Sequence, residues 1–331
     1  HKIDIENFNL GDLPKIDKQT ILENYDSILT DPNLSYDKIN RYVQAGKEDL
    51  LDDKYAVFSS GGSSGVRCHI PYDIEALYFI NGLTIFRSGL FAPSLKQNIA
   101  FLGGVNHTNN SSSIEKNGLI RNQVQINSFP LFYSDVEVVK MLNDLQPKTI
   151  AAYSYMLRNL AVQKLEGILN VYPKRLRCGG TFYSKGDKKI IEQAFGDLPY
   201  ENYGACESLM IACECKEHRG MHINEDIYYV ELTNDAKVKN TNLKISKGVT
   251  VTNLYNKSFP LIRYTLDDNV VYTNNSCKCG SSFRRIISVI GKGNDYFVFF
   301  NEEEKIKMAP ISLSNLIVDI PYIKEYRFVQ K

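Results

Sequence analysis

A run of small residues, FSSGGSSGVR at positions 58–67, offers the first candidate chemistry in this sequence. It follows DDKYAVF, an apolar run that is predicted to form a buried strand. Backbone N–H groups of a glycine-rich turn can converge on a phosphate because no Cβ atom obstructs them, and serine hydroxyls add donors. The same composition is typical of a flexible linker, so the run alone leaves both interpretations open. The lysine of the Walker pattern is absent, which excludes a Walker P-loop.

Cysteine and histidine residues gather in two further stretches. CECKEHRGMH at 213–222 and CKCG at 277–280 together offer four cysteines and two histidines. Thiolates and imidazoles are the ligands of a four-coordinate structural zinc site. Seven cysteines, an odd and clustered set, suit metal ligation in a reducing compartment better than a disulfide framework. Free thiols in a β-rich region are the alternative.

Strand and helix patterns alternate around these motifs. Helical spacing is expected at 18–29, 35–50, 73–82, 136–143, 154–169 and 185–195, and strands at 149–153, in LRCGG and on both sides of a loop within 99–132. The Gly/Ser run is therefore placed between a strand and a helix that opens near residue 73. After residue 222 the segments YYVEL, VTVTNL and VVYT are β-rich. This alternation of strands and helices, followed by β-rich segments, predicts a layered α/β domain and then a β subdomain.

Composition bounds the possible partners. The 331 residues are 43% hydrophobic and 23% charged, enough for one large domain or two unequal ones. Lys+Arg number 39 and Asp+Glu 38, so the net charge of +1 argues against a nucleic-acid partner. No apolar run is long enough to span a bilayer, and HKIDIENFNL lacks a signal-peptide pattern. These features predict a cytoplasmic protein without membrane insertion.

Five stretches occur in a recognisable order: SSGGSSG, LRCGGTFYS, ENYGACESLM, FPLIRYTLDD and ISVIGKGNDYF. In this order they resemble the motifs of the acyl-adenylate-forming (AMP-binding) superfamily. The resemblance is greatest to its phenylacetate–CoA-ligase-like branch, which includes capsule-biosynthesis relatives, and it runs from about residue 55 to the end of the chain. It implies an α/β fold with a large N-terminal adenylation domain.

The resemblance also implies the domain boundaries. The large domain would span 1–294 with a β subdomain near 222–290, and 295–331 would hold the hinge and an incomplete small C-terminal domain. Lys292 would replace the usual arginine of the hinge motif, and Asp295 would be the pivot. KMAPISLSNLIVDIPYIKEYRFVQK resembles only the opening of the family's small domain, and the invariant lysine near the end of that domain is not visible.

Nucleotide contacts are implied residue by residue. The loop would contact the ATP phosphates through Ser60, Gly62, Ser63, Ser64 and Gly65, with Arg67 near the position of a missing lysine. The adenine site would be made by Gly179, Gly180, Thr181, Tyr203 and Gly204. Close approach of backbone to a flat base explains the glycines, and a π-face suits stacking.

Three residues are matched to the family's catalytic positions, Glu207, Arg263 and Lys292, and Glu207 would hold magnesium. Asp268 would accept hydrogen bonds from the ribose, although the preceding Asp267 makes a shift of one residue the main alternative. In YGACE, Cys206 replaces the family's threonine. For zinc, the resemblance favours Cys215, His222, Cys277 and Cys279, with Cys213 and His218 as reserves.

The resemblance implies ATP-dependent activation of a carboxylic acid to acyl-AMP with release of pyrophosphate, followed by optional transfer to CoA or another thiol or amine. An ionised carboxylate needs no general base, so catalysis would come from positioning and charge neutralisation. The candidate walls of the acid pocket, Tyr133, Ser134, Phe182 and Ser208, favour an aryl or small apolar acid. Two alternatives stay open: a degenerate nucleotide- or acyl-adenylate-binding protein, and a scaffold that keeps only the fold.

Overall fold

The structure is a computed structural model of the whole chain. It describes residues 8–46, 49–60, 67–88, 97–103, 124–130, 134–179, 185–233, 235–292, 297–300, 305–308 and 329–330. The described helices are η1 (Leu10–Asp12), α1 (Lys18–Glu23), α2 (Tyr25–Ile28), α3 (Tyr36–Gln44), α4 (Ile74–Arg87), α6 (Asp135–Leu145), α7 (Ser154–Leu165) and α8 (Lys185–Phe195). None of them is long and apolar enough to cross a membrane.

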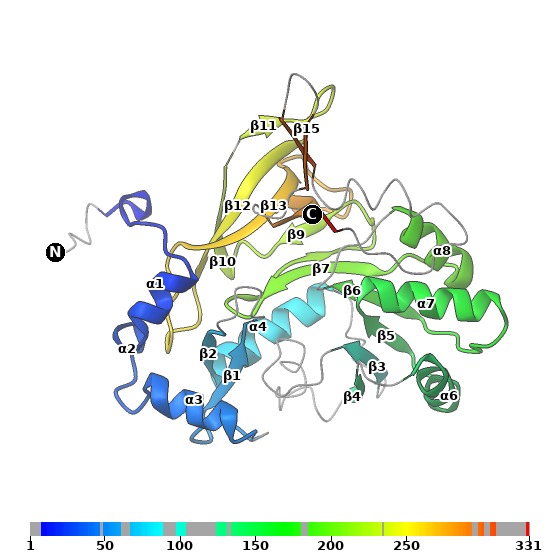
Figure 1. Cartoon of the computed structure of the whole chain (residues 1–331), viewed down its shortest axis with the longest axis horizontal. Coiled ribbons are helices and arrows are strands. Elements are labelled where there is room, and N and C mark those ends of the chain that lie inside the picture. The colour runs from blue at the N-terminus through cyan, green and yellow to red at the C-terminus, as the bar shows by residue number, and fades with distance from the viewer. Residues whose placement is uncertain are drawn as a thin grey trace.

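One large mixed sheet organises the molecule (Figure 1). Its parallel part is ordered β4 (Val124–Pro130), β3 (Gln97–Gly103), β5 (Thr149–Ala152), β6 (Arg175–Gly179), β7 (Tyr200–Ala205). Its antiparallel part continues with β8 (Leu209–Glu214), β9 (Met221–Ile223), β14 (Arg285–Lys292), β13 (Tyr264–Thr273), β12 (Lys244–Asn253) and β10 (Tyr228–Leu232), and β11 (Ala236–Lys237) pairs with β12. Ligands of such sheets bind at the carboxyl ends of the parallel strands.

Helices cover the parallel part on both faces. Cys178 of β6 packs in a cluster with residues of α6, α7 and α8. The preceding residue, Arg177, contacts Ser88 at the end of α4. Because adjacent residues of a strand point to opposite faces, α4 lies on the other side of the sheet from α7 and α8.

Two hydrophobic clusters form the core. One joins the N-terminal helices, β1 (Tyr55–Ser59) and β2 (His69–Asp73) to α4 and the antiparallel strands. The other fills the space between the parallel strands and α6, α7 and α8. The predicted α/β class and the β-rich segments after residue 222 are confirmed. Those late strands continue the same sheet instead of forming one of their own. The expected helices are found in place, but 18–29 is divided into α1 and α2, and α3 and α7 end at Gln44 and Leu165, before the expected residues 50 and 169.

The environment of the Gly/Ser run differs from the expectation. The run is followed by β2, which pairs antiparallel with β1, so it joins the two strands of a hairpin and not a strand and a helix. HIPYD escaped detection because it is short and almost wholly buried, without the alternation that marks a half-buried strand. The expected helix start is confirmed: Asp73 caps α4 by accepting a hydrogen bond from the Ala76 N–H at 2.8 Å.

The described part of the C-terminal region is a small hairpin. β15 (Phe297–Phe300) pairs antiparallel with β16 (Lys305–Met308) in a separate two-stranded sheet. Asp295 and most of 309–331 lie outside the described residues. The boundary at residue 294 and the hinge role of Asp295 therefore stay predictions.

Candidate functional site

The YGACE segment forms the turn between β7 and β8, where the parallel and antiparallel parts of the sheet meet. A bulge lies between Tyr203 and Gly204. A Cβ atom on Gly204 would stand 2.1 Å from the carbonyl oxygen of Leu209. The turn therefore requires glycine for a close approach of two backbones.

Substitution of this glycine has a clear expected result. We expect Gly204→Ala to lower the free energy of unfolding by about 2 kcal/mol or more, because the backbone of Leu209 must move. Gly82→Ala is the matched control: Gly82 is exposed on α4 with no atom near its Cβ position, so alanine should stabilise by roughly 0.5–1 kcal/mol. Thermal melting of the two variants decides, and equal midpoints would contradict the close approach.

Tyr203 and Asp268 meet across the sheet. The Tyr203 hydroxyl donates a hydrogen bond of 2.8 Å to Oδ2 of Asp268 on β13. Burial of Tyr203, together with the adjacent Asp268 carboxylate, raises the pKa of the phenol well above its usual range. The phenol is therefore a permanent donor, and it holds the Asp268 carboxylate beside the end of β7.

Lys292 is placed in the same neighbourhood by strand register. It lies opposite Asp268 in the antiparallel pair of β13 and β14. Directly opposite residues share a face, with Cβ atoms roughly 5 Å apart. Asp267 is exposed, and as the preceding residue of β13 it points to the other face. The structure thus brings Asp268, not Asp267, together with Tyr203 and Lys292.

Glu207 is a buried carboxylate at the centre of the turn, 6% exposed. Its Oε1 accepts a hydrogen bond of 3.0 Å from the hydroxyl of Tyr264. Among the described residues, no cationic side chain forms an ion pair with it. A buried charge without an opposite charge is costly, so this position suits a carboxylate that neutralises a bound cation.

Cys206 joins this turn to the strand that precedes the Gly/Ser run. Its thiol donates to the carbonyl oxygen of Ser59, the last residue of β1, at 2.9 Å. Its own carbonyl accepts a bond of 3.3 Å from the Tyr72 hydroxyl. The replacement of the family's threonine therefore keeps a donor at this position, and it places Glu207 next to the start of the Gly/Ser run.

The base of the Gly/Ser run is held by paired polar contacts. The Ser60 N–H donates to the Cys68 carbonyl at 2.8 Å, and the Ser60 hydroxyl accepts from the Cys68 N–H at 2.9 Å. Ser59 Oγ and His69 Nδ1 lie 2.8 Å apart in a buried pair. Ser60 thus fixes where the run begins. The phosphate contacts predicted for Gly62, Ser63, Ser64 and Gly65 fall outside the described residues.

Gly179 ends β6 beside β7. A Cβ atom there would lie 2.4 Å from Nδ2 of Asn202, so the side chain of Asn202 occupies the space that glycine leaves. Three residues predicted to follow or line this turn, Gly180, Thr181 and Phe182, lie outside the described residues, as does Tyr133.

Two of the predicted pocket serines have structural partners. Ser134 is exposed and caps α6, accepting from the Glu137 N–H at 3.3 Å and donating to the Glu137 carboxylate at 2.8 Å. Ser208 is 2% exposed, and its N–H donates to the Ala205 carbonyl within the turn. A role in binding the acid stays a prediction for both.

The side chain of Arg263 binds residues outside the YGACE turn. Its guanidinium forms a bidentate ion pair with Glu231 at 2.9 and 2.8 Å and donates to the carbonyls of Gly11 and Leu13. These contacts tie the N-terminal segment to β10 and β13. They favour a structural role for Arg263, so its predicted catalytic role has no support in these contacts.

Four predicted zinc ligands converge. The ligand atoms of Cys215, His222, Cys277 and Cys279 all lie within 4.8 Å of one another. Cys215 Sγ and Cys277 Sγ are 3.8 Å apart, and Cys279 Sγ is 3.4 Å from His222 Nε2. Two thiolates of a tetrahedral zinc site are about 3.8 Å apart, given Zn–S bonds of about 2.3 Å. The donor set and the spacing both fit zinc.

The two reserve ligands stay outside this cluster. Cys213 is buried in β8, and His218 Nδ1 lies 3.3 Å from a Glu214 carboxylate oxygen while its ring packs on Tyr200. All seven cysteines are free. The cluster joins the β8–β9 connection to the β13–β14 connection, whose strands carry Asp268 and Lys292.

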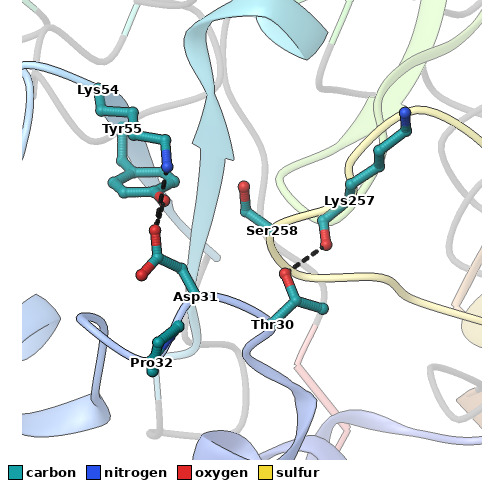
Figure 2. A pocket seen from close by; sticks show the side chains of 7 residues that line it. All are labelled: Thr30, Asp31, Pro32, Lys54, Tyr55, Lys257 and Ser258. Atoms are coloured by element: carbon teal, nitrogen blue, oxygen red, sulfur yellow. Dashed lines mark hydrogen bonds and ion pairs between the residues drawn. The ribbon is translucent and has the colours of Figure 1, made fainter.

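A cavity of about 320 Å³ opens at the other end of β1 (Figure 2). Figure 2 shows Asp31 facing Lys54 and Tyr55, which bind its carboxylate, while Lys257 points away. Tyr55 opens β1 and Ser59 closes it, so roughly 13 Å of strand separate this cavity from the Gly/Ser run. Sequence reasoning gave no signal for this cavity, which holds none of the predicted site residues.

Comparisons with known proteins agree with this architecture. No protein-family model matches the chain. The chain is 24% identical over 194 residues to the phenylacetate-coenzyme A ligase of Thermus thermophilus, a match that covers 56% of the chain and 42% of the ligase. A 2-hydroxyisobutyryl-CoA ligase in complex with R3-HIB-AMP superposes with a TM-score of 0.68 at 17% identity, covering 93% of the chain and 63% of the ligase. An anthranilate CoA ligase with anthranoyl-AMP gives a TM-score of 0.59 at 13% identity, covering 81% and 52%.

The chain thus has the fold of the adenylate-forming ligases, which confirms the predicted resemblance. It spans less than two thirds of each of these relatives.

Proposed function

We propose that the protein activates a carboxylic acid with ATP, forming acyl-AMP and pyrophosphate, and that the acyl group then passes to the thiol of CoA or to another thiol or amine. The observation that supports this proposal most is the hydrogen bond from Tyr203 to Asp268, with Lys292 opposite Asp268 in the strand register. Glu207 lies in the same turn as Tyr203, and its neighbour Cys206 contacts the start of the Gly/Ser run. The relatives with this fold support it, since two of them are CoA ligases that hold acyl-AMP.

Each described residue has a distinct task in this proposal. The Asp268 carboxylate, oriented by Tyr203, accepts hydrogen bonds from the ribose hydroxyls. The Lys292 ammonium, opposite Asp268, neutralises developing negative charge. Attack of one anion on another is opposed by repulsion, so these positioned charges supply catalysis without a general base.

Two metals belong to the proposal. Magnesium, when bound with ATP, screens the phosphate charges; the buried Glu207 carboxylate would hold it, and a hard oxygen donor suits that ion. Zinc would be bound by Cys215, His222, Cys277 and Cys279 as a structural ion. The clustering of the cysteines, which suits metal ligation better than disulfides, supports the predicted cytoplasmic location.

Pyrophosphate release tests the proposal directly. The chain is incubated with ATP, magnesium and a panel of carboxylic acids, and acid-dependent release is the expected result. Binding of ATP by calorimetry without release for any acid would favour the degenerate nucleotide-binding alternative. A chain that neither binds ATP nor releases pyrophosphate would contradict both the ligase and the nucleotide-binding function. The alternative of a scaffold that keeps only the fold would then remain.

Asp268→Ala provides a separate prediction about the ribose contact. We expect ATP binding to weaken by about 3 kcal/mol, the value of two charge-assisted hydrogen bonds at the lower end of their range. Asp267→Ala, the adjacent exposed carboxylate, is the control and should leave the affinity unchanged. Calorimetric titration of both variants with ATP decides. Weakening in Asp267→Ala alone would mean that the alignment is shifted by one residue.

A further inference from the structure

Arg177 is a buried arginine whose hydrogen-bond partners among the described residues are all neutral. It lies on β6 and is 4% exposed. Its guanidinium contacts Ser88 Oγ at 2.5 Å, Asn202 Oδ1 at 3.4 Å and Met210 Sδ at 4.0 Å. No carboxylate among the described residues forms an ion pair with it.

The charge persists in this environment. Burial lowers the pKa of Arg177 to about 10, so the side chain is still cationic at neutral pH. A buried cation without an anion is costly. The carbonyl groups at the end of α4, where Ser88 lies, offset only part of that cost, because a helix terminus carries about half a charge.

The position of Arg177 relates it to the nucleotide site. Residues two apart on a strand share a face, so Arg177 and Gly179 point to the same side, about 7 Å apart along β6. Asn202 lies beside both: its Oδ1 accepts from Arg177, and its Nδ2 fills the space next to Gly179. Arg177 therefore lies two residues farther than Gly179 from the carboxyl end of β6, on the same face of the sheet.

We propose that Arg177 is a specificity-determining residue that binds a second carboxylate of the acid, so that the substrates are short dicarboxylic acids. This inference rests on the proposed function, and it replaces the sequence-based preference for an aryl or small apolar acid. One carboxylate reacts at the nucleotide site, and the other pairs with the guanidinium fork, a geometry that favours bidentate binding.

Calorimetry with matched acids tests the inference. Wild-type protein with magnesium and a non-hydrolysable ATP analogue is titrated with succinate, glutarate, adipate and phthalate, and with butyrate, valerate, hexanoate and benzoate. We expect the best dicarboxylate to bind on the order of 100-fold more tightly than its matched monocarboxylate. Arg177→Met should abolish this preference. Arg87→Met is the control: Arg87 pairs with Asp226 at the same helix end, and its loss should leave the preference intact.

Each other outcome has a definite meaning. A wild type that binds the analogue but shows no preference, or that binds none of the eight acids, overturns the inference alone. A wild type that does not bind the analogue overturns the proposed function. Persistence of the preference in Arg177→Met overturns the inference as well. If that variant does not fold, Arg177→Lys decides: lysine lacks the fork, so the preference should fall at least about tenfold, and an unchanged preference is the contrary result.

Discussion

Glu207→Gln should abolish magnesium-dependent ATP binding while the protein stays folded. Glutamine has nearly the same shape as glutamate, and its amide oxygen can still accept the hydrogen bond from the Tyr264 hydroxyl. The negative charge that suits a cation at this buried position is lost. Calorimetric titration with ATP, with and without magnesium, gives the effect, and we expect a loss of about 3 kcal/mol or more.

Tyr264→Phe tests the hydrogen bond to Glu207 separately from the negative charge of Glu207. This variant removes the hydroxyl that holds Glu207 but keeps the carboxylate, so magnesium-dependent binding should weaken and not vanish. Melting curves of both variants show whether the fold is retained. Equal magnesium-dependent affinity in wild type and a folded Glu207→Gln variant would remove Glu207 from the magnesium site.

Removal of zinc should lower both stability and ATP affinity. Four ligands bound to one ion join the β8–β9 and β13–β14 connections, and β13 and β14 carry Asp268 and Lys292. Binding of structural zinc contributes on the order of 10 kcal/mol in small domains, and part of that is coupled to folding. Protein purified without chelator should contain about one zinc per chain by elemental analysis, an expectation that follows from the four-ligand set.

The variants make this test specific. Chelator should lower the melting temperature of wild type, whereas Cys277→Ser should melt at a low temperature with or without chelator. Cys213→Ala is the control, since this nearby thiol lies outside the cluster and its variant should still respond to chelator. Wild-type protein that contains no zinc and is fully stable would contradict the zinc site.

The zinc cluster shows what sequence reasoning could reach. The ligand types in two short stretches indicated a zinc site but left four cysteines and two histidines open. The resemblance to the family favoured Cys215 and His222 over Cys213 and His218, and the structure brings the favoured four together. The end of β8 gives the physical reason: Cys213 lies within the strand, whereas Cys215 follows its last residue, where the backbone leaves the strand and a side chain can turn toward the next connection.

Other features depend on tertiary contacts that no local pattern records. Arg263 matched a motif of the family. Its partners Glu231 and Gly11 are distant in the chain, so its ion pair and hydrogen bonds could not be predicted from the sequence. Arg177 lies in the short strand RLRCG, and only the folded structure shows that its described hydrogen-bond partners are neutral. Strand β2 was missed because its burial on both faces hides the period of two.

Formation of acyl-AMP from ATP and a carboxylic acid is the reaction proposed for this chain. The measurement that tests it most directly is the exchange of radioactive pyrophosphate into ATP, because exchange requires reversible formation of an acyl-adenylate. We predict exchange that depends on both magnesium and an acid, and that is lost in Glu207→Gln. Binding of magnesium–ATP without exchange for any mono- or dicarboxylic acid would contradict the claim.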